Sequence, residues 1–492
     1  MKQQDRETAS WSDLYRSGHF ASVVLLSFGV WLHAADELMV STITPALIGE
    51  IGGERYVAWL ISLYEVGSIV SGALSALVVL RFGIRNSMAC AALIYLTGCV
   101  ISGIAPSILE MLAGRLIQGL GGGAMIAVSF VAVHRLIPEA LTTRVFALIS
   151  VVWGVSAFSG PLIGALFADL GIWRGAFFLF AIQALALALV VMRYFEREAA
   201  SVAGVDARGG VRLALRILIL GAGIVLVAAS GTRQIAIEQA TLAAAGFALL
   251  GLFVFLDGSS GNNRILPARP LNIYQPQGAM MMMVVFMSIS TMGLITYGPI
   301  FMTRFHGMSA SAVGIVLLLE SVGWSLGAVG VASLEGKWQD RAIMFGFTSV
   351  ALSLAILYFA MVSGPIPFIA LSAFVQGTGF GVAWTFLIKR ADRLAGPGER
   401  ERIASAIPTL QRFGYALGAA FTGIIANSSG FAEAGDISTV ETAANRIFLL
   451  SLIPVCLGLL AMLRFLSFAV PAKKETARQG PPPPSPDNIQ IT

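Results

Sequence analysis

The sequence predicts an all-α polytopic membrane protein, and two observations lead to this fold class. The chain of 492 residues is 57% hydrophobic and only 12% charged, with a mean hydropathy of +0.81, whereas a soluble domain of this length needs a more polar surface. Apolar runs of about 18 or more residues recur along nearly the whole chain. Such runs predict membrane-spanning helices, because the strands of a membrane β-barrel would give short alternating segments.

The first part of the chain contains a polar lead-in and a predicted half of six spans. Residues 1–19 form the lead-in, which we place in the cytoplasm. The first apolar run is too long, and too polar at its end, for a cleaved signal peptide, so it is predicted to be a retained span. The six-helix half covers 20–195, with spans near 20–48, 56–79, 87–105, 108–134, 144–168 and 173–195.

The rest of the chain gives eight further spans. A connector, 196–278, carries two additional spans near 213–231 and 236–256. A second six-helix half, 279–468, has spans near 279–303, 312–333, 342–362, 366–388, 404–427 and 446–468. The tail, 469–492, has too few apolar residues to fold and is predicted to be a disordered cytoplasmic segment. The sequence therefore predicts fourteen transmembrane helices, grouped six, two and six.

The distribution of basic residues predicts the orientation. With both termini in the cytoplasm, the outer segments hold few of the 32 Lys and Arg residues, namely Arg55, Arg174, Arg233, Arg304 and Arg446. Two more, Arg115 and Arg412, lie within predicted spans, and the others fall on the cytoplasmic side, as the positive-inside rule requires. This loop placement, and not nucleic-acid binding, accounts for the net charge of +5. We expect a bacterial-type inner membrane.

Two sequence echoes indicate that the six-span halves are repeats. The segment Gln118 to Gly123 (QGLGGG) recurs 258 residues later as QGTGFG, beginning at Gln376. Glu65, followed seven residues on by Gly-Ala, recurs 255 residues later as Glu320 in the same context. Parallel repeats separated by an inserted pair of helices are typical of secondary transporters, whose substrate sites lie between the halves near the membrane midplane.

Several motifs in order resemble the major facilitator superfamily, and specifically its fourteen-span drug:proton antiporter family of the multidrug efflux type. The segment GRLIQGLGGGAM, which begins at Gly114, resembles the span-four motif of that family. The span-five antiporter motif is matched by Gly154 and by Gly160-Pro161-Leu162-Ile163-Gly164, followed by Trp173-Arg174. Asp36 and Pro45 are spaced as in the span-one motif. The resemblance implies the major facilitator fold.

The chain departs from this pattern after its second predicted span. Ala76 and Leu80 stand where the family has a glycine and an aspartate, and the aspartate helps to couple the two halves in relatives. Gly83, with Arg81 and Arg85, is kept, so we expect a tight basic turn there. The usual gating scheme is therefore in doubt for this chain.

Six charged residues lie within predicted spans, where each costs about 2.5 to 3.5 kcal/mol unless it is paired, protonated or hydrated: Asp36, Glu37, Glu65, Arg115, Glu320 and Arg412. Four of these side chains are acidic and two are basic. A carboxyl group that changes protonation as its exposure changes is what proton-coupled transport needs. We predict that proton coupling involves Asp36, Glu37, Glu65, Arg115 and Glu320.

Asp36, with Arg115 as its partner, is the first choice for the proton site, and a permanent salt bridge between two helices is the alternative. His33 shares a helix face with Glu37 and is either a hydrogen-bonded helix residue or a member of a relay. Glu65 and Glu320, related by the repeat, are expected to face each other. They could also be protonated groups that hydrogen-bond neighbouring helices.

The remaining candidates fall into two groups. We expect the substrate cavity to include His33, Gln118, Tyr297, Gln376, Trp384 and Arg412, with Arg412 as the counter-charge from the second half. Close helix crossings that slide during transport are expected at Gly119, Gly122, Gly160, Pro161 and Gly164, although small residues at such spacing can also serve packing alone.

The expected function is proton-coupled export of amphipathic compounds, cationic or neutral, by alternating access. Two alternatives stay open: a symporter or facilitator of the same fold for a nutrient or metabolite, and a membrane sensor or scaffold without transport. The sequence contains no phosphate-binding loop, metal-ligand cluster or nucleophile paired with a base, so we expect no enzyme activity, metal or cofactor. The expected partners are the substrate, protons and the lipid bilayer; we expect a monomer, and docking of a periplasmic adaptor stays open.

Overall fold

The computed structural model describes residues 11–196, 207–396, 399–433 and 436–469, and within these ranges all regular structure is helical. The predicted all-α fold is therefore confirmed for the described residues. Residues 1–10 of the predicted lead-in, 197–206 of the predicted connector and the predicted tail from 470 lie outside the described residues.

The helices of the N-terminal half follow the predicted spans. They are α1 (Trp11–Arg16), α2 (Phe20–Ile51), α3 (Val57–Ile104), α4 (Ile108–Leu136), α5 (Glu139–Asp169) and α6 (Arg174–Tyr194), with the short 3-10 helix η1 (Glu54–Tyr56) before α3. Most extend a few residues beyond the predicted boundaries, because polar residues at the ends of a span continue the helical hydrogen bonding beyond the apolar run.

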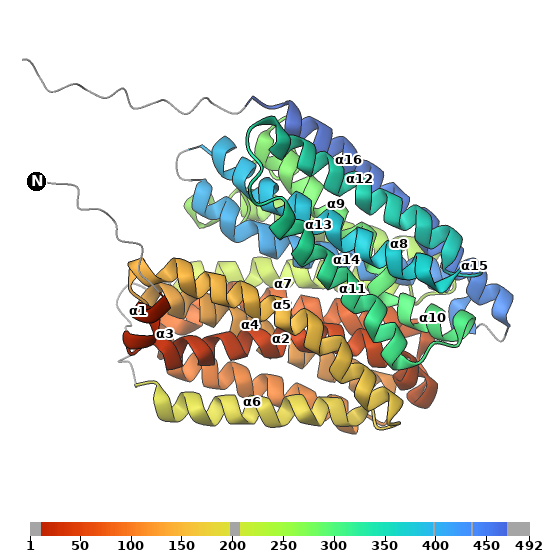
Figure 1. The fold of residues 1–492 in the computed structure, drawn as a ribbon, viewed down its shortest axis with the longest axis horizontal. Coiled ribbons are helices and arrows are strands. Elements are labelled where there is room, and N and C mark those ends of the chain that lie inside the picture. Colours follow the sequence, from red (N-terminus) through yellow and green to blue (C-terminus); the bar gives the residue numbers. More distant parts are fainter. Residues whose placement is uncertain (1–10, 197–206, 397–398, 434–435, 470–492) are drawn as a thin grey trace, which may run out of the picture.

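The second and third predicted spans are joined in α3, which turns at Gly83. This residue has φ 75° and ψ 169°, a backbone conformation that glycine adopts readily and that side chains with a Cβ atom avoid. Arg81 and Arg85 flank it, so the predicted tight basic turn is confirmed. The turn lies at the same end of the bundle as α1 (Figure 1). We call this end of the molecule the terminal end.

The remaining helices are α7 (Ala207–Ser230), α8 (Ala236–Gly258), α9 (Pro276–Thr296), α10 (Gly298–His306), α11 (Ala310–Gly330), α12 (Lys337–Ala360), α13 (Ile366–Leu394), α14 (Arg400–Ser428), α15 (Ile437–Leu450) and α16 (Leu452–Ser467). The 3-10 helices η2 (Gly261–Asn263) and η3 (Phe431–Glu433) lie in the connections. Two predicted spans are each divided in two, α9 from α10 at Tyr297 and α15 from α16 at Ser451. Pro299 and Pro454 follow these breaks, and proline disrupts the helical hydrogen bonds of the preceding turn.

Within the part of the chain that the structure describes, twelve helical stretches are long and apolar enough to cross a membrane. One of them, the 51-residue stretch Glu54–Ile104, contains the two predicted spans on either side of Gly83. The charged α14 stands outside the twelve, although it packs against α3, α7 and α9 within the bundle. The count of fourteen stays a prediction, which depends on dividing α3 at Gly83 and on including α14.

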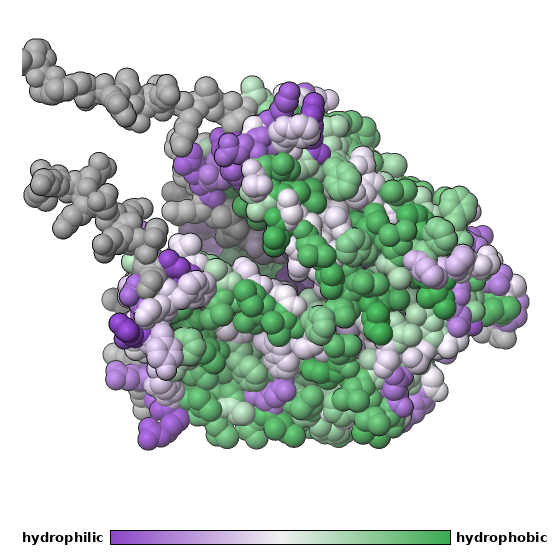
Figure 2. Space-filling model, viewed as in Figure 1, coloured by the Kyte–Doolittle hydropathy of each residue, from purple (hydrophilic) through white to green (hydrophobic). Residues whose placement is uncertain are grey.

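The helices form two bundles that lie side by side along their length (Figure 1). Helices α2 to α6 form one bundle, and α9 to α16 form the other. Helix α7 packs against both α3 and α14, so the inserted helix pair touches both bundles. Figure 2 shows the surface hollowed between the bundles at the terminal end, while apolar side chains cover most of the visible flank.

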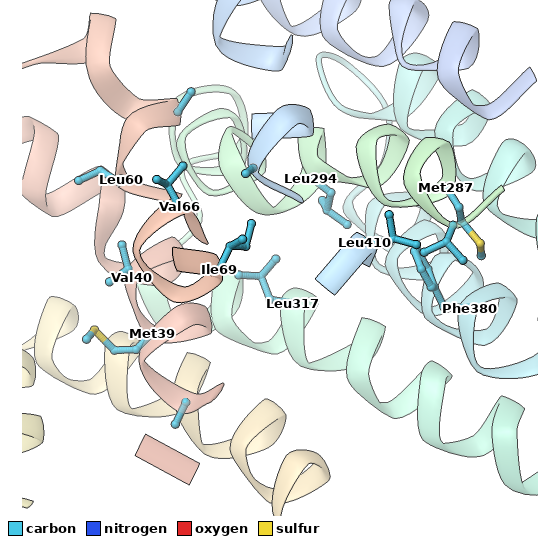
Figure 3. Close-up of a cluster of buried hydrophobic side chains, with 14 of the residues drawn as sticks. Met39, Val40, Leu60, Val66, Ile69, Met287, Leu294, Leu317, Phe380 and Leu410 are labelled. Atoms are coloured by element: carbon cyan, nitrogen blue, oxygen red, sulfur yellow. The ribbon is translucent and has the colours of Figure 1, made fainter. Parts of the chain in front are cut away.

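Away from the terminal end, the two bundles are in contact. Gly314 of α11 lies so near α5 that an added Cβ atom would be 3.1 Å from the Pro161 carbonyl oxygen. On the other side of the interface, the Ser62 hydroxyl of α3 donates to the carbonyl oxygen of Ala416 in α14 at 3.0 Å. Figure 3 shows buried apolar side chains from both bundles, among them Val66 and Leu317, which pack together in one core. The molecule is therefore closed at one end and hollowed at the other.

Candidate functional site

A fully buried ion pair joins α2 to α4. The Arg115 guanidinium donates to the Asp36 carboxylate at 2.8 Å, and the two side chains are 1% and 0% exposed. Arg115 also donates to the Leu60 carbonyl oxygen at 3.1 Å, and its guanidinium lies 4.2 Å from the ring centroid of Tyr64. The pairing predicted for Asp36 and Arg115 is thus present in the structure.

Gln118 belongs to this same buried cluster. Its side-chain oxygen accepts from Arg115 at 3.1 Å and from the Ser102 hydroxyl at 3.0 Å, while its amide lies 3.2 Å from the Cys99 sulfur and 3.4 Å from Asp36. Gln118 is completely buried, so in this conformation it holds the ion pair and does not border the hollow, contrary to the prediction for the cavity.

A second charge cluster connects the two bundles. Arg412 of α14 lies 3.1 Å from the carboxylate of Glu65 on α3 and 3.4 Å from that of Glu37 on α2. The Glu65 side chain is fully buried, whereas Arg412 and Glu37 are 16% and 18% exposed. Arg412 also lies over the ring of Trp153, 5.7 Å from its centroid. Arg412 is therefore the counter-charge from the second half, as predicted, and it neutralises acids of the first half.

His33 and Tyr64 lie between these two clusters. The Tyr64 hydroxyl is 2.9 Å from His33 Nδ1 and 3.0 Å from the His33 carbonyl oxygen. The other ring nitrogen, Nε2, is 4.0 Å from the Glu37 carboxylate. His33 is completely buried, so it does not line an open cavity surface. The structure instead places it between the Tyr64 hydroxyl and the Glu37 carboxylate.

Glu320 of α11 has a different environment from Glu65. Its carboxylate accepts from the Gln376 amide of α13 at 3.0 Å, and the Gln376 side-chain oxygen accepts from Ser353 at 3.3 Å. Among the described residues, no ion pair within 4.0 Å involves Glu320. Glu65 is therefore paired across the bundles, whereas Glu320 is hydrogen-bonded within its own half, and the facing arrangement of the two acids stays a prediction.

The register of the glycine contacts explains this difference. A Cβ atom on Gly119 would be 2.1 Å from the Tyr64 carbonyl oxygen, and one on Gly377 would be 1.7 Å from that of Glu320. The next contacts repeat the pattern, with Gly123 against Ser68 and Gly381 against Trp324.

The counterpart of Glu320 in the first half is therefore Tyr64, and the counterpart of Glu65 is Ser321. The sequence echo misaligned the second helix of each half by one residue. One residue turns a side chain by about 100° around a helix, which is enough to direct it to a different neighbour.

An aromatic group lies one helical turn along α11 from Glu320. Trp324 of α11 stacks on Phe380 with a centroid distance of 5.0 Å and lies 6.0 Å from Trp384. Trp324 and Trp384 are partly exposed. Tyr297, also predicted for the cavity, is instead fully buried against Phe301 and Phe431 near the closed end, so it does not border the hollow.

The predicted glycine crossings are confirmed as close contacts. Added Cβ atoms on Gly160 and Gly164 would lie 2.4 and 2.6 Å from backbone oxygens of α2, with Pro161 between them, and one on Gly122 would lie 2.5 Å from His33 Nδ1. Gly154 differs, because nothing lies within 4 Å of its added Cβ atom. The structure thus assigns packing to four of these glycines, and their sliding stays a prediction.

A group of contacts at the closed end was not found from the sequence. Arg55 before α3 forms an ion pair with Glu433 after α14, and Gln234, between α7 and α8, donates to Glu433 at 2.9 Å. The hydrogen bond from Gln234 and the nearby Arg55 lower the pKa of Glu433. Asn427 donates to the carbonyl oxygens of Arg55 and Gly231, both at 2.9 Å. Loop residues carry no periodic signal, so only the structure shows that these segments meet.

Asp169, the last residue of α5, makes a second contact between the bundles. Its carboxylate accepts from the backbone amides of Ala310 and Ser311 at 2.9 and 3.0 Å, and also from the Ser311 hydroxyl. A carboxylate is favoured at the N-terminus of a helix, here α11, because the first amides have no partner within the helix. The closed end is therefore held by polar contacts on two sides.

The comparisons with known proteins agree with this geometry. The family model described as Major Facilitator Superfamily matches residues 26–419. A protein of Mycobacterium tuberculosis named "Probable multidrug-efflux transporter" is 29% identical over 451 residues, which cover 90% of this chain and 94% of the relative. "Multidrug resistance protein 3" of Bacillus subtilis is 23% identical, covering 82% of this chain and 78% of the relative.

Solved structures show the same fold. A D-xylose-proton symporter matches with a TM-score of 0.63 and 16% identity, over 92% of this chain and 98% of the symporter. A POT family transporter in complex with 5-aminolevulinic acid matches with a TM-score of 0.64 and 15% identity, over 90% and 96%. The chain is a multi-pass membrane transporter, not an enzyme, and belongs to the Major Facilitator Superfamily.

Proposed function

We propose that this transporter exports amphipathic compounds, cationic or neutral, in exchange for protons. The names of the relatives support export of drugs or toxic compounds, and the membrane would be the cytoplasmic membrane of a bacterium. The excess of basic residues near the terminal end supports a cytoplasmic location for both termini. The hollow between the bundles then opens toward the cytoplasm.

The observation that carries this proposal is the ion pair between Arg412 and Glu65. It joins one bundle to the other, and it includes an acid that is fully buried. Protonation of that acid removes its attraction for Arg412, and deprotonation restores it. A proton can thus change the energy of contact between the two halves, which is what coupling to alternating access requires.

The Asp36 and Arg115 pair provides a second protonation site within the first half. Its complete burial means that an ionised Asp36 depends on Arg115 for its stability in this conformation. Binding of a proton at Asp36 would release the arginine from its carboxylate partner. We place proton binding at Asp36 and Glu65, with Glu37 as the exposed acid of the network.

The substrate region lies between Trp153 of α5 and the Trp324, Phe380 and Trp384 group of the second half. Aromatic surfaces accept flat or bulky apolar groups without demanding one shape. Glu320 lies beside them with an amide partner, so it can attract a cation. The protein works as a monomer, without a cofactor, and the proton gradient supplies the energy.

Purified protein in proteoliposomes tests this function. Addition of a cationic substrate should cause proton movement in the wild type. This movement should be reduced in Asp36→Asn and Glu65→Gln, which lose proton sites, and in Glu320→Gln, which loses the charge that attracts the cation. Glu50→Gln is a matched control. Glu50 is an acid on α2, as Asp36 is, but it lies near the C-terminal end of this helix and is 53% exposed. Proton coupling that survives in all three variants would contradict the assignment of the proton sites.

A further inference from the structure

We propose that His33 and Tyr64 relay protons between Glu37, at the hollow, and the buried Asp36. This inference rests on the proposed proton coupling and specifies its route. Neither residue binds substrate in this scheme. Each acts by carrying a proton between two carboxyl groups that do not touch.

The burial of Asp36 creates the need for a relay. Asp36 is 0% exposed, and its two carboxylate oxygens are occupied by Arg115 and Gln118. A proton that arrives in the hollow therefore cannot reach this carboxylate directly in the conformation observed. Glu37, the next residue, is 18% exposed and turned away toward Arg412. The path between the two acids has to pass through neighbouring side chains.

Tyr64 supplies the contact with the buried pair. Its ring centroid lies 4.2 Å from the Arg115 guanidinium, which in turn donates to the Asp36 carboxylate at 2.8 Å. Its hydroxyl oxygen is within hydrogen-bonding distance of both His33 Nδ1 and the His33 carbonyl oxygen, at 2.9 and 3.0 Å. A hydroxyl has one proton, so it donates to one of these acceptors at a time.

The orientation of this hydroxyl is linked to the tautomer of His33. When Tyr64 donates to Nδ1, the ring proton of neutral His33 is on Nε2. When Tyr64 donates elsewhere, Nδ1 can carry the proton, and Nε2 becomes an acceptor. Nε2 is buried without a hydrogen-bond partner, and it is 4.0 Å from the Glu37 carboxylate. A shift of about 1 Å in the Glu37 side chain would make this a hydrogen bond.

One transfer along this path conserves protons at every step. Glu37 gives its proton to His33 Nε2, His33 Nδ1 gives its proton to the Tyr64 oxygen, and Tyr64 gives its hydroxyl proton to Asp36. The imidazole and the phenol end uncharged, in the opposite tautomer and orientation. The net result is a neutral Asp36 and an ionised Glu37. When Glu37 holds the proton, Arg115 has an ionised partner in Asp36. When Asp36 holds the proton, Arg412 has an ionised partner in Glu37.

The surroundings of His33 fit this role. The groups that face it are Tyr64 from α3, Glu37 from its own helix, Arg412 from α14 and Trp153 from α5, whose ring lies edge-on at 6.4 Å. Arg115 acts on it from α4 across Tyr64. Gly122 of α4 leaves the space that the ring occupies, because a Cβ atom there would be 2.5 Å from Nδ1. His33 is thus enclosed by groups from both bundles, with Glu37 as the acid near its Nε2.

The test compares Tyr64→Phe with Tyr95→Phe. Tyr95 is equally buried on α3, and its hydroxyl donates to the Leu32 carbonyl oxygen at 3.3 Å, next in sequence to the carbonyl that Tyr64 contacts. Both substitutions remove one hydroxyl and keep the ring. Proteoliposomes report two rates, substrate-dependent proton movement and substrate counterflow without a proton gradient.

The relay predicts that Tyr64→Phe slows proton movement by about a hundredfold, the low end of what positioned acid and base groups contribute, while counterflow stays near the wild-type rate. Tyr95→Phe should change neither rate. His33→Gln provides a second variant, which should slow proton movement to a similar degree. Equal proton rates in Tyr64→Phe and Tyr95→Phe, or a parallel fall of counterflow and proton movement in Tyr64→Phe and His33→Gln, would overturn the relay.

The wild type and Asp36→Asn separate this inference from the proposed function. If the wild type moves no protons with substrate, both the function and the relay are wrong. If the wild type moves protons, Asp36→Asn does not, and Tyr64→Phe behaves as Tyr95→Phe, the function stands and the relay is wrong.

Discussion

The Arg412 guanidinium of α14 lies 3.1 Å from the buried carboxylate of Glu65 on α3, so a cation of one half neutralises an acid of the other. Removal of one partner from such a buried ion pair lowers the stability of the protein, because the remaining charge stays buried without its partner. The pair therefore connects the position of the two bundles to the protonation of one side chain.

Removal of Arg412 alone should destabilise the protein strongly. We expect Arg412→Gln to lower the free energy of unfolding by about 3 kcal/mol, because Glu65 is then left without its partner. The double variant Arg412→Gln with Glu65→Gln should recover much of this loss and still lack proton coupling. Thermal unfolding in detergent measures the first effect, and proteoliposome transport measures the second. Additive losses of stability in the double variant would show that the two residues do not interact.

Substitution of Glu320 should affect the transport of cationic and neutral substrates differently. Glu320→Gln keeps a side chain that can bond Gln376 but removes the negative charge next to Trp324 and Trp384. We expect transport of permanently cationic compounds to fall by about tenfold, which corresponds to a loss of about 1.4 kcal/mol, and transport of neutral compounds to change little. The ratio of the two rates in one preparation is the measurement. An equal effect on both classes would assign Glu320 a structural role.

Two glycine positions predict opposite responses to the same substitution. Gly377→Ala would place a Cβ atom 1.7 Å from the Glu320 carbonyl oxygen, so α11 and α13 would have to separate, and we expect a loss of about 1–3 kcal/mol. Gly154→Ala meets nothing within 4 Å and should be neutral or stabilising by up to about 1 kcal/mol. Thermal unfolding of the two variants checks this contrast. A similar loss at both positions would contradict the packing described here.

The contact between Arg55 and Glu433 should weaken in acid. The pKa of Glu433 is lowered, so the charged form is favoured in the closed state, and the stabilisation is present at neutral pH and lost as the pH falls through the lowered pKa. Spin labels at residues 54 and 438, on opposite sides of this contact, should report longer distances in Glu433→Gln at neutral pH and in the wild type at acidic pH.

Glu110→Gln is the control for this measurement, since Glu110 bonds Ser107 within its own half at the same end. Distances that are the same in Glu433→Gln and in the control would show that this contact does not hold the end closed.

The fold could be predicted from the sequence because the bilayer demands long apolar helices and because glycine-rich crossings recur in both halves. The breaks at Tyr297 and Ser451 were not predicted, since the apolar runs continue across them and only the following prolines mark the positions. The pairing of Asp36 with Arg115 followed from a family motif.

The site itself depended on details that periodicity does not contain. An offset of 255 residues aligned Glu65 with Glu320, whereas the helix contacts align Tyr64 with Glu320. Tyr64 was not predicted for this reason. Its position directly before an acid in an apolar run is a sequence signal that could have identified it. Trp153, Asp169 and Glu433 act through contacts between segments far apart in the chain, which only the folded arrangement reveals.

The most direct test of proton antiport is the direction of uphill transport in a pH gradient. Proteoliposomes with an acidic interior and no membrane potential receive a permanently charged quaternary ammonium compound, which cannot be trapped by protonation, and protein-free vesicles provide the background. We expect the compound to accumulate inside, because protons leave as substrate enters, and we expect Asp36→Asn to abolish this accumulation. Accumulation only when the interior is alkaline, or equilibration without accumulation in either gradient, would contradict proton antiport.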